Sequence, residues 1–318
     1  PSRHHQRPVA LMRRRSAVAI GGGTGLPLVL GCLLRGEFDV TAVVTVADDG
    51  GSSGHLRREL GMLPPGDIRN CLVALADPAS ELARVFQYRF AEGEGLAGHA
   101  LGNLIIAALA DLEGGFAEAV EEAGRLLGVR GRVLPSTIAD VVLSGRDAAG
   151  RLVKGQAKLA ESDGPVTTVC LDRPSVPAYP PALEALRTAD VIVVGPGSLF
   201  TSVIPNFLVD GIAGAVAESD AEVVYVCNVG NLRGETSGMD AADHVEALLR
   251  HGLTGLIDIV LVDSALSPED GSHVTGGPDV LARIEALGMR AFSADLADHA
   301  DPMRHDPDRL FAALAEVW

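Results

Sequence analysis

Short apolar runs alternate with helical patterns along this chain, and the first such pair sets the arrangement. Residues 16–20 read Ser-Ala-Val-Ala-Ile, the pattern of a short buried strand, and residues 26–34 have the apolar spacing of a helix. The run over 40–46 is almost wholly β-branched or apolar and predicts a second strand. Strand, glycine turn, helix and strand in this order are typical of a doubly wound nucleotide-binding fold.

The same alternation continues to the C-terminus. The patterns predict a helix from about Asp67 to Ala76, helices over residues 80–92, 104–112, 116–127, 181–188 and 240–251, and a last helix capped by Asp306. They predict further strands over 190–194, 222–227, 257–262 and 290–292. Two alternating runs around the polar turn 146–150 indicate an antiparallel hairpin. We therefore predict an α/β, Rossmann-like fold: a mostly parallel sheet with helices on both faces and a β-hairpin region inserted at about 136–160.

The domain organisation follows from what is missing between these elements. No internal repeat or low-complexity linker interrupts residues 16–318, which predicts a single domain. Residues 1–15 carry five arginines and no acid, and we interpret them as a disordered basic extension, with a membrane-surface or nucleic-acid tail as the alternative. No apolar run suits a signal peptide or a membrane span, so we expect a cytoplasmic protein.

Composition narrows the class of partner. Aromatic residues make up only 4% of a 47% hydrophobic chain, so small and branched aliphatic side chains fill the core. The net charge of −16 argues against a nucleic-acid partner, which requires a basic surface. The four cysteines form no C-x-x-C pair, and we expect reduced, buried thiols.

The glycine turn at residues 21–25, the first glycine loop, is the leading candidate for ligand binding. Its small residues let backbone N–H groups approach a ligand at a helix N-terminus, where the dipole favours an anion. We expect the phosphates of a nucleotide on Gly22, Gly23, Thr24 and Gly25. The match to G-x-G-x-x-G is imperfect because Leu26 replaces the third glycine, and close packing of helix and strand is the structural alternative.

Acidic and hydroxyl residues follow the second predicted strand. Asp48 lies where an acid at the end of that strand would meet a ribose hydroxyl, and we expect ligand contact from Asp48 or Asp49. The alternative is that they cap a helix starting near Gly54. Ser52 and Ser53 belong to a second small-residue loop that can face the same crevice.

The turn Pro64-Pro65-Gly66 precedes a predicted helix with an anion-binding character. Asp67 is placed either as a ligand contact or as the N-cap of that helix. Arg69 and Asn70 lie in its first turn, where exposed amides and a guanidinium suit an anionic ligand. A surface ion pair is the alternative for Arg69.

His99 and Asn103 are four residues apart and share a helical face. His99 is a general acid or base, or a ligand donor, on one interpretation, and a capping or core histidine on the other. No H-x-x-x-H or H-E-x-x-H partner supports a metal site here.

A second strand-end loop covers residues 195–202, the second glycine loop. Parallel sheets bind ligands at the carboxyl ends of their strands, so this loop should line the same crevice as the first. We expect Gly197, Ser198, Thr201 and Ser202 to contact phosphate oxygens, with Asn228 contributing from the end of the next strand. Ser198 is not a nucleophile-elbow serine, because Gly-Pro-Gly-Ser lacks the G-x-S-x-G form.

Taken together, these motifs closely resemble the gluconeogenesis factor family (YvcK-like), which belongs with the phospholactate transferases of coenzyme F420 synthesis (CofD-like) in one superfamily. The resembling stretches are residues 20–26, 46–54, 63–72, 98–103, 131–137, 195–202 and 234–236. The resemblance extends from about residue 17 to 311.

The resemblance implies a Rossmann-like cytoplasmic homodimer that binds a UDP-sugar such as UDP-N-acetylglucosamine. It also implies a role in cell shape and wall synthesis during growth on gluconeogenic carbon. The sequence resembles the family's C-terminal Arg-His-Asp at Arg304, which is carried over as a diphosphate or uracil-side contact. Residues 228–231 and 264–279, Phe200 and Met239 depart from the family pattern.

Two functions remain in competition at this point. The first is a nucleotide-sugar-binding regulator without turnover, with no certain cofactor. The second is a transferase of a phospholactyl-type group from a nucleotide diphosphate donor, which would need Mg²⁺ at Asp48 or Asp49 to neutralise the leaving diphosphate. The imperfect fingerprint and the lack of a catalytic dyad disfavour a nicotinamide-dependent oxidoreductase.

Overall fold

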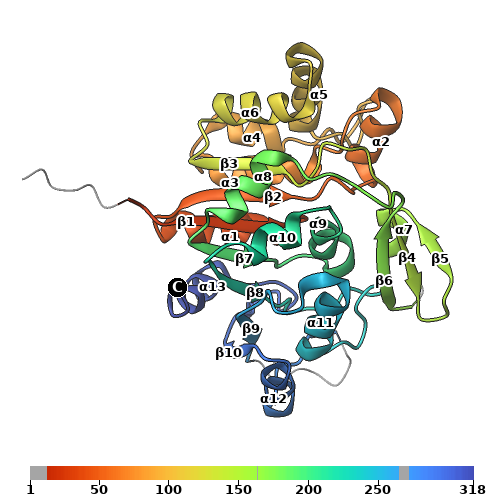
Figure 1. Ribbon diagram of the computed structural model, residues 1–318. Helices are drawn as coiled ribbons and strands as arrows, with labels where there is room; N and C mark the ends of the chain where they lie inside the picture. The colour runs from red at the N-terminus through yellow and green to blue at the C-terminus, as the bar shows by residue number, and fades with distance from the viewer. Residues whose placement is uncertain (1–12, 163, 265–271) are drawn as a thin grey trace, which may run out of the picture.

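A seven-stranded, fully parallel sheet forms the centre of the protein (Figure 1). The computed structural model describes residues 13–162, 164–264 and 272–318. The strand order is β10-β9-β8-β7-β1-β2-β3, so the chain reverses its direction of winding between β1 and β7. The strands are β1 (Ser16–Gly21), β2 (Asp39–Val44), β3 (Gly131–Pro135), β7 (Val191–Val194), β8 (Glu222–Val226), β9 (Ile259–Asp263) and β10 (Arg290–Ala294).

Helices cover both faces of this sheet, as the sequence predicts (Figure 1). They are α1 (Leu26–Arg35), α2 (Gly51–Leu60), α3 (Gly66–Leu75), α4 (Glu81–Gln87), α5 (Leu101–Glu113), α6 (Phe116–Leu127), α7 (Gln156–Ala160), α8 (Pro180–Arg187), α9 (Ile204–Phe207), α10 (Ile212–Ala217), α11 (Ala241–Leu248), α12 (Pro278–Ala286) and α13 (Pro307–Ala315). Two π-helical turns, η1 (Leu199–Val203) and η2 (Leu249–Leu253), extend the set.

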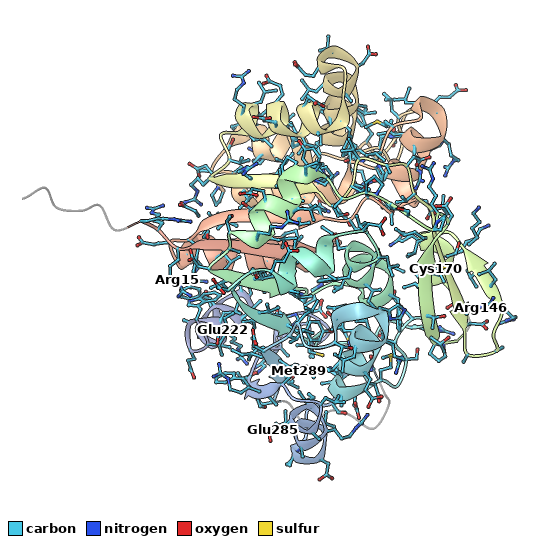
Figure 2. The ribbon with its side chains drawn as sticks, in the orientation of Figure 1. Arg15, Arg146, Cys170, Glu222, Glu285 and Met289 are labelled. Carbon is cyan, nitrogen blue, oxygen red and sulfur yellow. The ribbon has the colours of Figure 1, made fainter. Side chains whose placement is uncertain are left out.

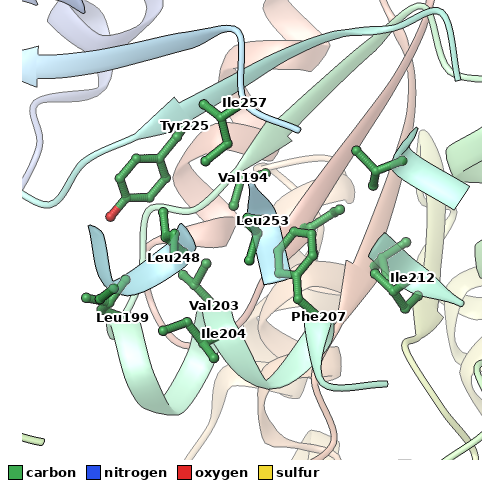
Figure 3. Packing of buried hydrophobic residues seen from close by; sticks show 14 of the residues in the cluster. Val194, Leu199, Val203, Ile204, Phe207, Ile212, Tyr225, Leu248, Leu253 and Ile257 are labelled. Atoms are coloured by element: carbon green, nitrogen blue, oxygen red, sulfur yellow. The ribbon is translucent and has the colours of Figure 1, made fainter. Parts of the chain in front are cut away.

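The core has two halves because alternate residues of each strand point to opposite faces. On one face Ile20 and Val194 pack with Tyr225, Val203 and Leu248, and Figure 3 shows part of this cluster. On the other face the intervening strand residues pack against α1, α3 and α13. Burial on both faces explains why these strands read as continuous apolar runs.

A smaller antiparallel sheet, here called the insertion, projects beside the main sheet at the right of Figure 1. Its strands are β4 (Leu143–Asp147), β5 (Leu152–Lys154) and β6 (Val166–Leu171), in the order β5-β4-β6, and α7 accompanies them. The predicted hairpin is confirmed as β4 and β5. The sequence did not reveal the third strand β6 or α7, because short half-exposed elements leave a weak periodic signal.

Three local predictions are corrected by the structure. The helix expected over 80–92 ends at Gln87, because Tyr88 and Phe90 form backbone hydrogen bonds with Leu101 and His99. The helix expected near Gly54 begins at Gly51, and no side chain caps it. Cys170 lies exposed on the insertion (Figure 2), whereas the other three cysteines are buried.

The capping prediction for the last helix is confirmed, since Asp306 accepts hydrogen bonds from Asp308 N and Arg309 N. Within the described residues no helix has the length and apolar character needed to cross a membrane. The single-domain boundaries stay a prediction, and most of the N-terminal extension (residues 1–12) lies outside the described residues.

Candidate functional site

The two glycine loops meet where the winding of the sheet reverses. The first follows β1 and the second follows β7, and these strands are neighbours. A Cβ on Gly25 would lie 2.5 Å from Pro196 O, and one on Gly197 would lie 3.0 Å from Gly22 O. The two backbones can pack this closely only because both positions lack side chains. This crevice is where open α/β sheets bind their ligands.

A hollow of about 390 Å³ opens between these loops, on the side of α13. Thr24 and Gly25 line it from the first loop, and Gly197 and Ser198 line it from the second. Arg304, on the segment before α13, completes the wall. Thr24 and Arg304, 280 positions apart in the chain, therefore share one concavity, and the two loops line it together as the sequence predicts.

Unused backbone donors line this hollow. The amides of Thr24, Gly25 and Ser198 donate no hydrogen bond to any described residue. Gly25 is the N-cap of α1, which has no side-chain cap. Free N–H groups at a helix N-terminus favour an anion.

Asn228 and His305 hold the far wall of the hollow. Asn228 Oδ1 accepts from Gly197 N at 3.1 Å, and Asn228 Nδ2 donates to Gly197 O at 2.8 Å. His305 Nε2 lies 3.0 Å from Cys227 O, and burial lowers the pKa of His305 to about 4, so the ring is neutral at pH 7. His305 was not predicted as a site residue from the sequence, although its position directly after Arg304 was a usable signal.

Asp67 closes the other side of the first glycine loop. Gly23 N donates to Asp67 Oδ2 at 2.7 Å, and a Cβ on Gly22 would lie 2.7 Å from the same oxygen. Burial raises the pKa of Asp67 to about 6, and the charge of Asp48 adds to the increase. Asp67 is not the N-cap of α3, since Pro65 occupies that position. Its carboxyl group instead takes one of the amides we expected to bind phosphate.

Glu235 accepts hydrogen bonds from amides of the second glycine loop, as Asp67 does from the first. It was not predicted from the sequence as a functional residue. It is fully buried and accepts from Phe200 N at 2.8 Å, Thr201 N at 3.2 Å and Thr201 Oγ1 at 3.1 Å. Burial raises its pKa. The Thr201 hydroxyl is therefore already used, and contact with a phosphate would require it to leave Glu235.

Ser202 and Asn206 connect the second glycine loop to the first through close contacts. The Ser202 hydroxyl oxygen lies 3.2 Å from the position of a Cβ on Gly23. Asn206 is fully buried, and its Nδ2 donates to Gly21 O at 3.2 Å and Ser202 O at 2.9 Å. Asn206 was not predicted, because its contact with Gly21 joins residues 185 positions apart in the chain.

The two acids after β2, Asp48 and Asp49, accept hydrogen bonds from different parts of the chain. Asp48 Oδ1 accepts from Gly50 N at 2.9 Å, and burial raises its pKa. Asp49 Oδ1 accepts from Ala157 N at 2.8 Å, so Asp49 anchors the insertion. Ser53 Oγ accepts from Gly66 N at 3.1 Å and thereby ties the start of α2 to that of α3.

A second polar group, formed by Ser52, His99 and Asn103, contributes nothing to the lining of the hollow. Asn103 Nδ2 donates to Ser52 Oγ at 3.0 Å, and His99 Nδ1 lies 3.1 Å from the same oxygen. Arg69 is buried and forms no ion pair with a described residue, so the surface ion pair considered for it is wrong. Its Nη2 donates to Asn70 Oδ1 at 2.6 Å.

The chemistry of a metal site is limited to a pair of carboxylates. Among the described residues no three His, Cys, Asp or Glu side chains converge as a metal-binding group. Asp48 and Asp67 are close enough that the charge of Asp48 raises the pKa of Asp67.

Comparisons with known proteins identify the family to which this architecture belongs. The family model for 2-phospho-L-lactate transferase CofD matches residues 17–297. A crystal structure of a UPF0052-family protein from Bacillus halodurans superposes with a TM-score of 0.89 at 39% identity, and the match covers 96% of this chain and 99% of that one. The fold and its loops therefore define a CofD-like protein.

Curated relatives identify the group within the CofD family to which this chain belongs. The gluconeogenesis factor of Halalkalibacterium halodurans is 45% identical over 312 residues, covering 96% of this chain and 97% of the relative. That of Bacillus subtilis is 41% identical over 314 residues, covering 96% and 99%. This chain belongs to the gluconeogenesis factors (YvcK-like) within the CofD family.

Proposed function

We propose that this protein is a cytoplasmic regulator that binds a nucleotide sugar of the UDP-N-acetylglucosamine type and is needed for cell shape and wall synthesis during gluconeogenic growth. The observation that carries the proposal is the set of three unused amides, from Thr24, Gly25 and Ser198, beside Arg304 in one hollow. The name of the relatives, gluconeogenesis factor, supports the physiological part.

The hollow has the two chemical characters of a nucleotide diphosphate. The amides and the dipole of α1 suit the diphosphate, and the Arg304 guanidinium adds a positive charge near them. Leu28, Leu232 and Met303 line the same hollow and suit the apolar faces of a nucleoside. Local donors of this kind explain how a chain of net charge −16 would bind an anion.

We further propose that the protein acts without turnover, and that it is a homodimer, as the family resemblance implies. The nucleotide sugar is then a signal, and a downstream protein receives it. Expected contacts on the sugar or ribose side come from Asp48, which follows β2 at the same edge of the sheet.

Calorimetric titration with UDP-N-acetylglucosamine tests the binding. We expect Arg304→Ala to weaken binding about 10- to 100-fold, the usual effect of losing a charge-assisted contact. Arg84→Ala is a matched control, because both side chains are 74% exposed and both pair with an acid three residues earlier. The control should bind like the parent protein.

Ligand fragments sharpen the test. UDP should bind and free N-acetylglucosamine should not, since the amides and Arg304 address the diphosphate. Failure of the parent protein to bind UDP-N-acetylglucosamine at millimolar concentration would rule out the proposal.

The second candidate is a phospholactyl-type transferase, favoured by the match to the CofD model and by the Asp48–Asp67 pair. The pair fits Mg²⁺, which takes one or two carboxylates together with phosphate oxygens and would relieve the repulsion between the two acids. When bound, Mg²⁺ would neutralise charge on a leaving diphosphate. Asp49 is the poorer ligand, since it holds Ala157 N.

Mass spectrometry separates the two functions. A transferase should modify a deazaflavin acceptor from a nucleotide diphosphate donor only when Mg²⁺ is present. No transfer with or without Mg²⁺, together with binding of the nucleotide sugar, would leave the regulator.

A further inference from the structure

Arg69 is a buried cation whose hydrogen-bonding capacity is largely unused. Its residue exposure is 5%, and its Nε and Nη1 are buried without a hydrogen-bond partner in the described part of the chain. Only Nη2 is paired, with the neutral amide oxygen of Asn70 at 2.6 Å. A guanidinium in this state loses its hydration without gaining an anion in return, which costs free energy of folding.

Arg69 lies at the N-terminal end of α5, beside a second buried polar side chain whose hydrogen-bonding capacity is partly unused. A Cβ on Gly102 would lie 2.8 Å from Arg69 Cδ, so the side chain passes against the first turn of α5. That helix has 13 residues and no side-chain cap. Asn103, in the same turn, is 1% exposed and its Oδ1 also lacks a partner among the described residues.

A second arginine increases the excess of positive charge. Arg89 is close enough to lower the pKa of Arg69, adding to the effect of burial, while Asp67 opposes the decrease. Arg89 Nη1 donates to Gly98 O at 2.6 Å and forms no ion pair with a described residue. Two guanidinium groups thus lie near one helix N-terminus, and neither forms an ion pair with a described carboxylate.

We propose that Arg69, Arg89 and Asn103, here called the Arg69 cluster, form a second anion-binding site that takes the phosphate group of a small molecule. None of the three lines the hollow between the glycine loops, so the site does not depend on the function proposed for that hollow. The incoming group replaces Asn70 on Nη2 and engages a second nitrogen of the planar fork, as bidentate oxyanions do.

Entry to the site lies on the side of Arg89. Arg89 is exposed, and so is every residue from 91 to 98, the turn whose Gly98 carbonyl it holds. Because Nε and Nη1 are closed off from solvent, binding requires Arg89 and this turn to shift. The alternative explanation is a water molecule trapped between Arg69 and Asn103, which would satisfy the unpaired atoms without any ligand.

The test uses the full chain in an Arg304→Ala background, which weakens any anion site in the hollow. Inorganic phosphate is the probe, followed by calorimetry and by the melting temperature. We expect Arg69→Met to weaken phosphate binding at least about tenfold. The same change should raise the melting temperature of the phosphate-free protein by about 2–4 °C, because it removes a buried unpaired charge.

Two further variants keep the result decisive. Arg69→Lys retains the charge but lacks the fork, and it should also lose at least about tenfold in phosphate affinity with an unchanged circular dichroism spectrum. Arg84→Met removes an exposed arginine elsewhere and should change nothing. Acetate in place of phosphate tests whether a carboxylate suffices.

The proposal is overturned if the Arg304→Ala protein binds no phosphate at about 10 mM, a concentration that detects even weak sites. It is equally overturned if either Arg69 variant loses less than about tenfold, which is the result that a trapped water predicts. Neither outcome bears on nucleotide binding in the hollow, which is measured with Arg304 intact.

Discussion

In each of the two glycine loops a buried carboxyl group accepts hydrogen bonds from backbone amides, but the two carboxyl groups differ in how many donors they accept. In the first loop, Asp67 accepts a single amide, from Gly23, and the residue as a whole is half-buried. In the second loop, Glu235 is fully buried and accepts two amides and a hydroxyl. Each loop therefore carries an internal acceptor at amides that an external anion would otherwise use.

The difference indicates which loop is fixed and which can adjust. Glu235 leaves three donors unpaired if it moves, so the start of η1 is held in one conformation. Asp67 releases only one, and the pKa of about 6 places its titration near physiological pH. We infer that the second loop is a rigid wall of the hollow and that the first loop is the part that responds to its surroundings.

Removing the fixed carboxyl group should have the largest effect. Glu235→Ala leaves Phe200 N, Thr201 N and the Thr201 hydroxyl unpaired in the interior, and we expect a loss of about 3–5 kcal/mol in the free energy of unfolding. Denaturant titration measures it. Glu235→Gln keeps one carbonyl oxygen and should lose about 1–2 kcal/mol. A loss below about 1 kcal/mol in the alanine variant would contradict the rigid-wall interpretation.

The contact between the loops gives the next effect. Gly25→Ala places a Cβ 2.5 Å from Pro196 O, a backbone atom that cannot turn aside, and should destabilise the protein by about 1–3 kcal/mol. Gly31→Ala in α1 is the control, since no atom lies within 4 Å of its added Cβ. The control should gain about 0.5–1 kcal/mol from helix propensity. Equal stability of the two variants in thermal unfolding would show that the loops do not pack as described.

The adjustable carboxyl group should give the smallest effect, visible as pH dependence. The pKa of Asp67 is raised from 3.8 to about 6 in the folded protein, so its favourable contribution is present below pH 4 and is lost as the pH rises through 6. Asp67→Asn keeps an acceptor for Gly23 N and does not titrate. Relative to this variant, the parent should lose about 1–2 kcal/mol of stability between pH 4 and 7, allowing for solvent screening.

Paired unfolding curves across that pH range provide the measurement. A difference that does not vary with pH would show that Asp67 has an ordinary pKa. A difference of the opposite sign would show that the carboxylate is stabilised in its ionised form, and the contrast with Glu235 would then disappear.

The order of elements in the main sheet was predictable because each strand is buried on both faces. Runs such as 42–46 and 191–194 are buried at every position, so local pattern alone identifies them. The insertion was only half predicted, since β5 has no buried residue and burial along β6 does not alternate regularly, so their pairing is settled by contacts across the chain. Helix α4 ended early for the same reason, through backbone bonds to residues 99 and 101.

The residues of the candidate site were likewise only partly predictable from the sequence. Thr24, Ser198 and Arg304 were identified from motifs, and the structure brings them to one hollow. Glu235 and Asn206 escaped notice because an acid or amide without a local pattern acquires a role only from the donors around it. Asn206 reaches the first glycine loop through Gly21, which lies 185 positions away and which no spacing rule connects to it.

The sequence by itself determined that two glycine-rich strand ends exist and that a parallel sheet presents them at one edge, since burial and backbone freedom are local properties of residue type. Only the tertiary structure decided which amides stay free. Hydrogen bonding is a competition among all donors and acceptors that folding brings together, and here Asp67 and Glu235 take part of the amide supply and leave Thr24, Gly25 and Ser198 open.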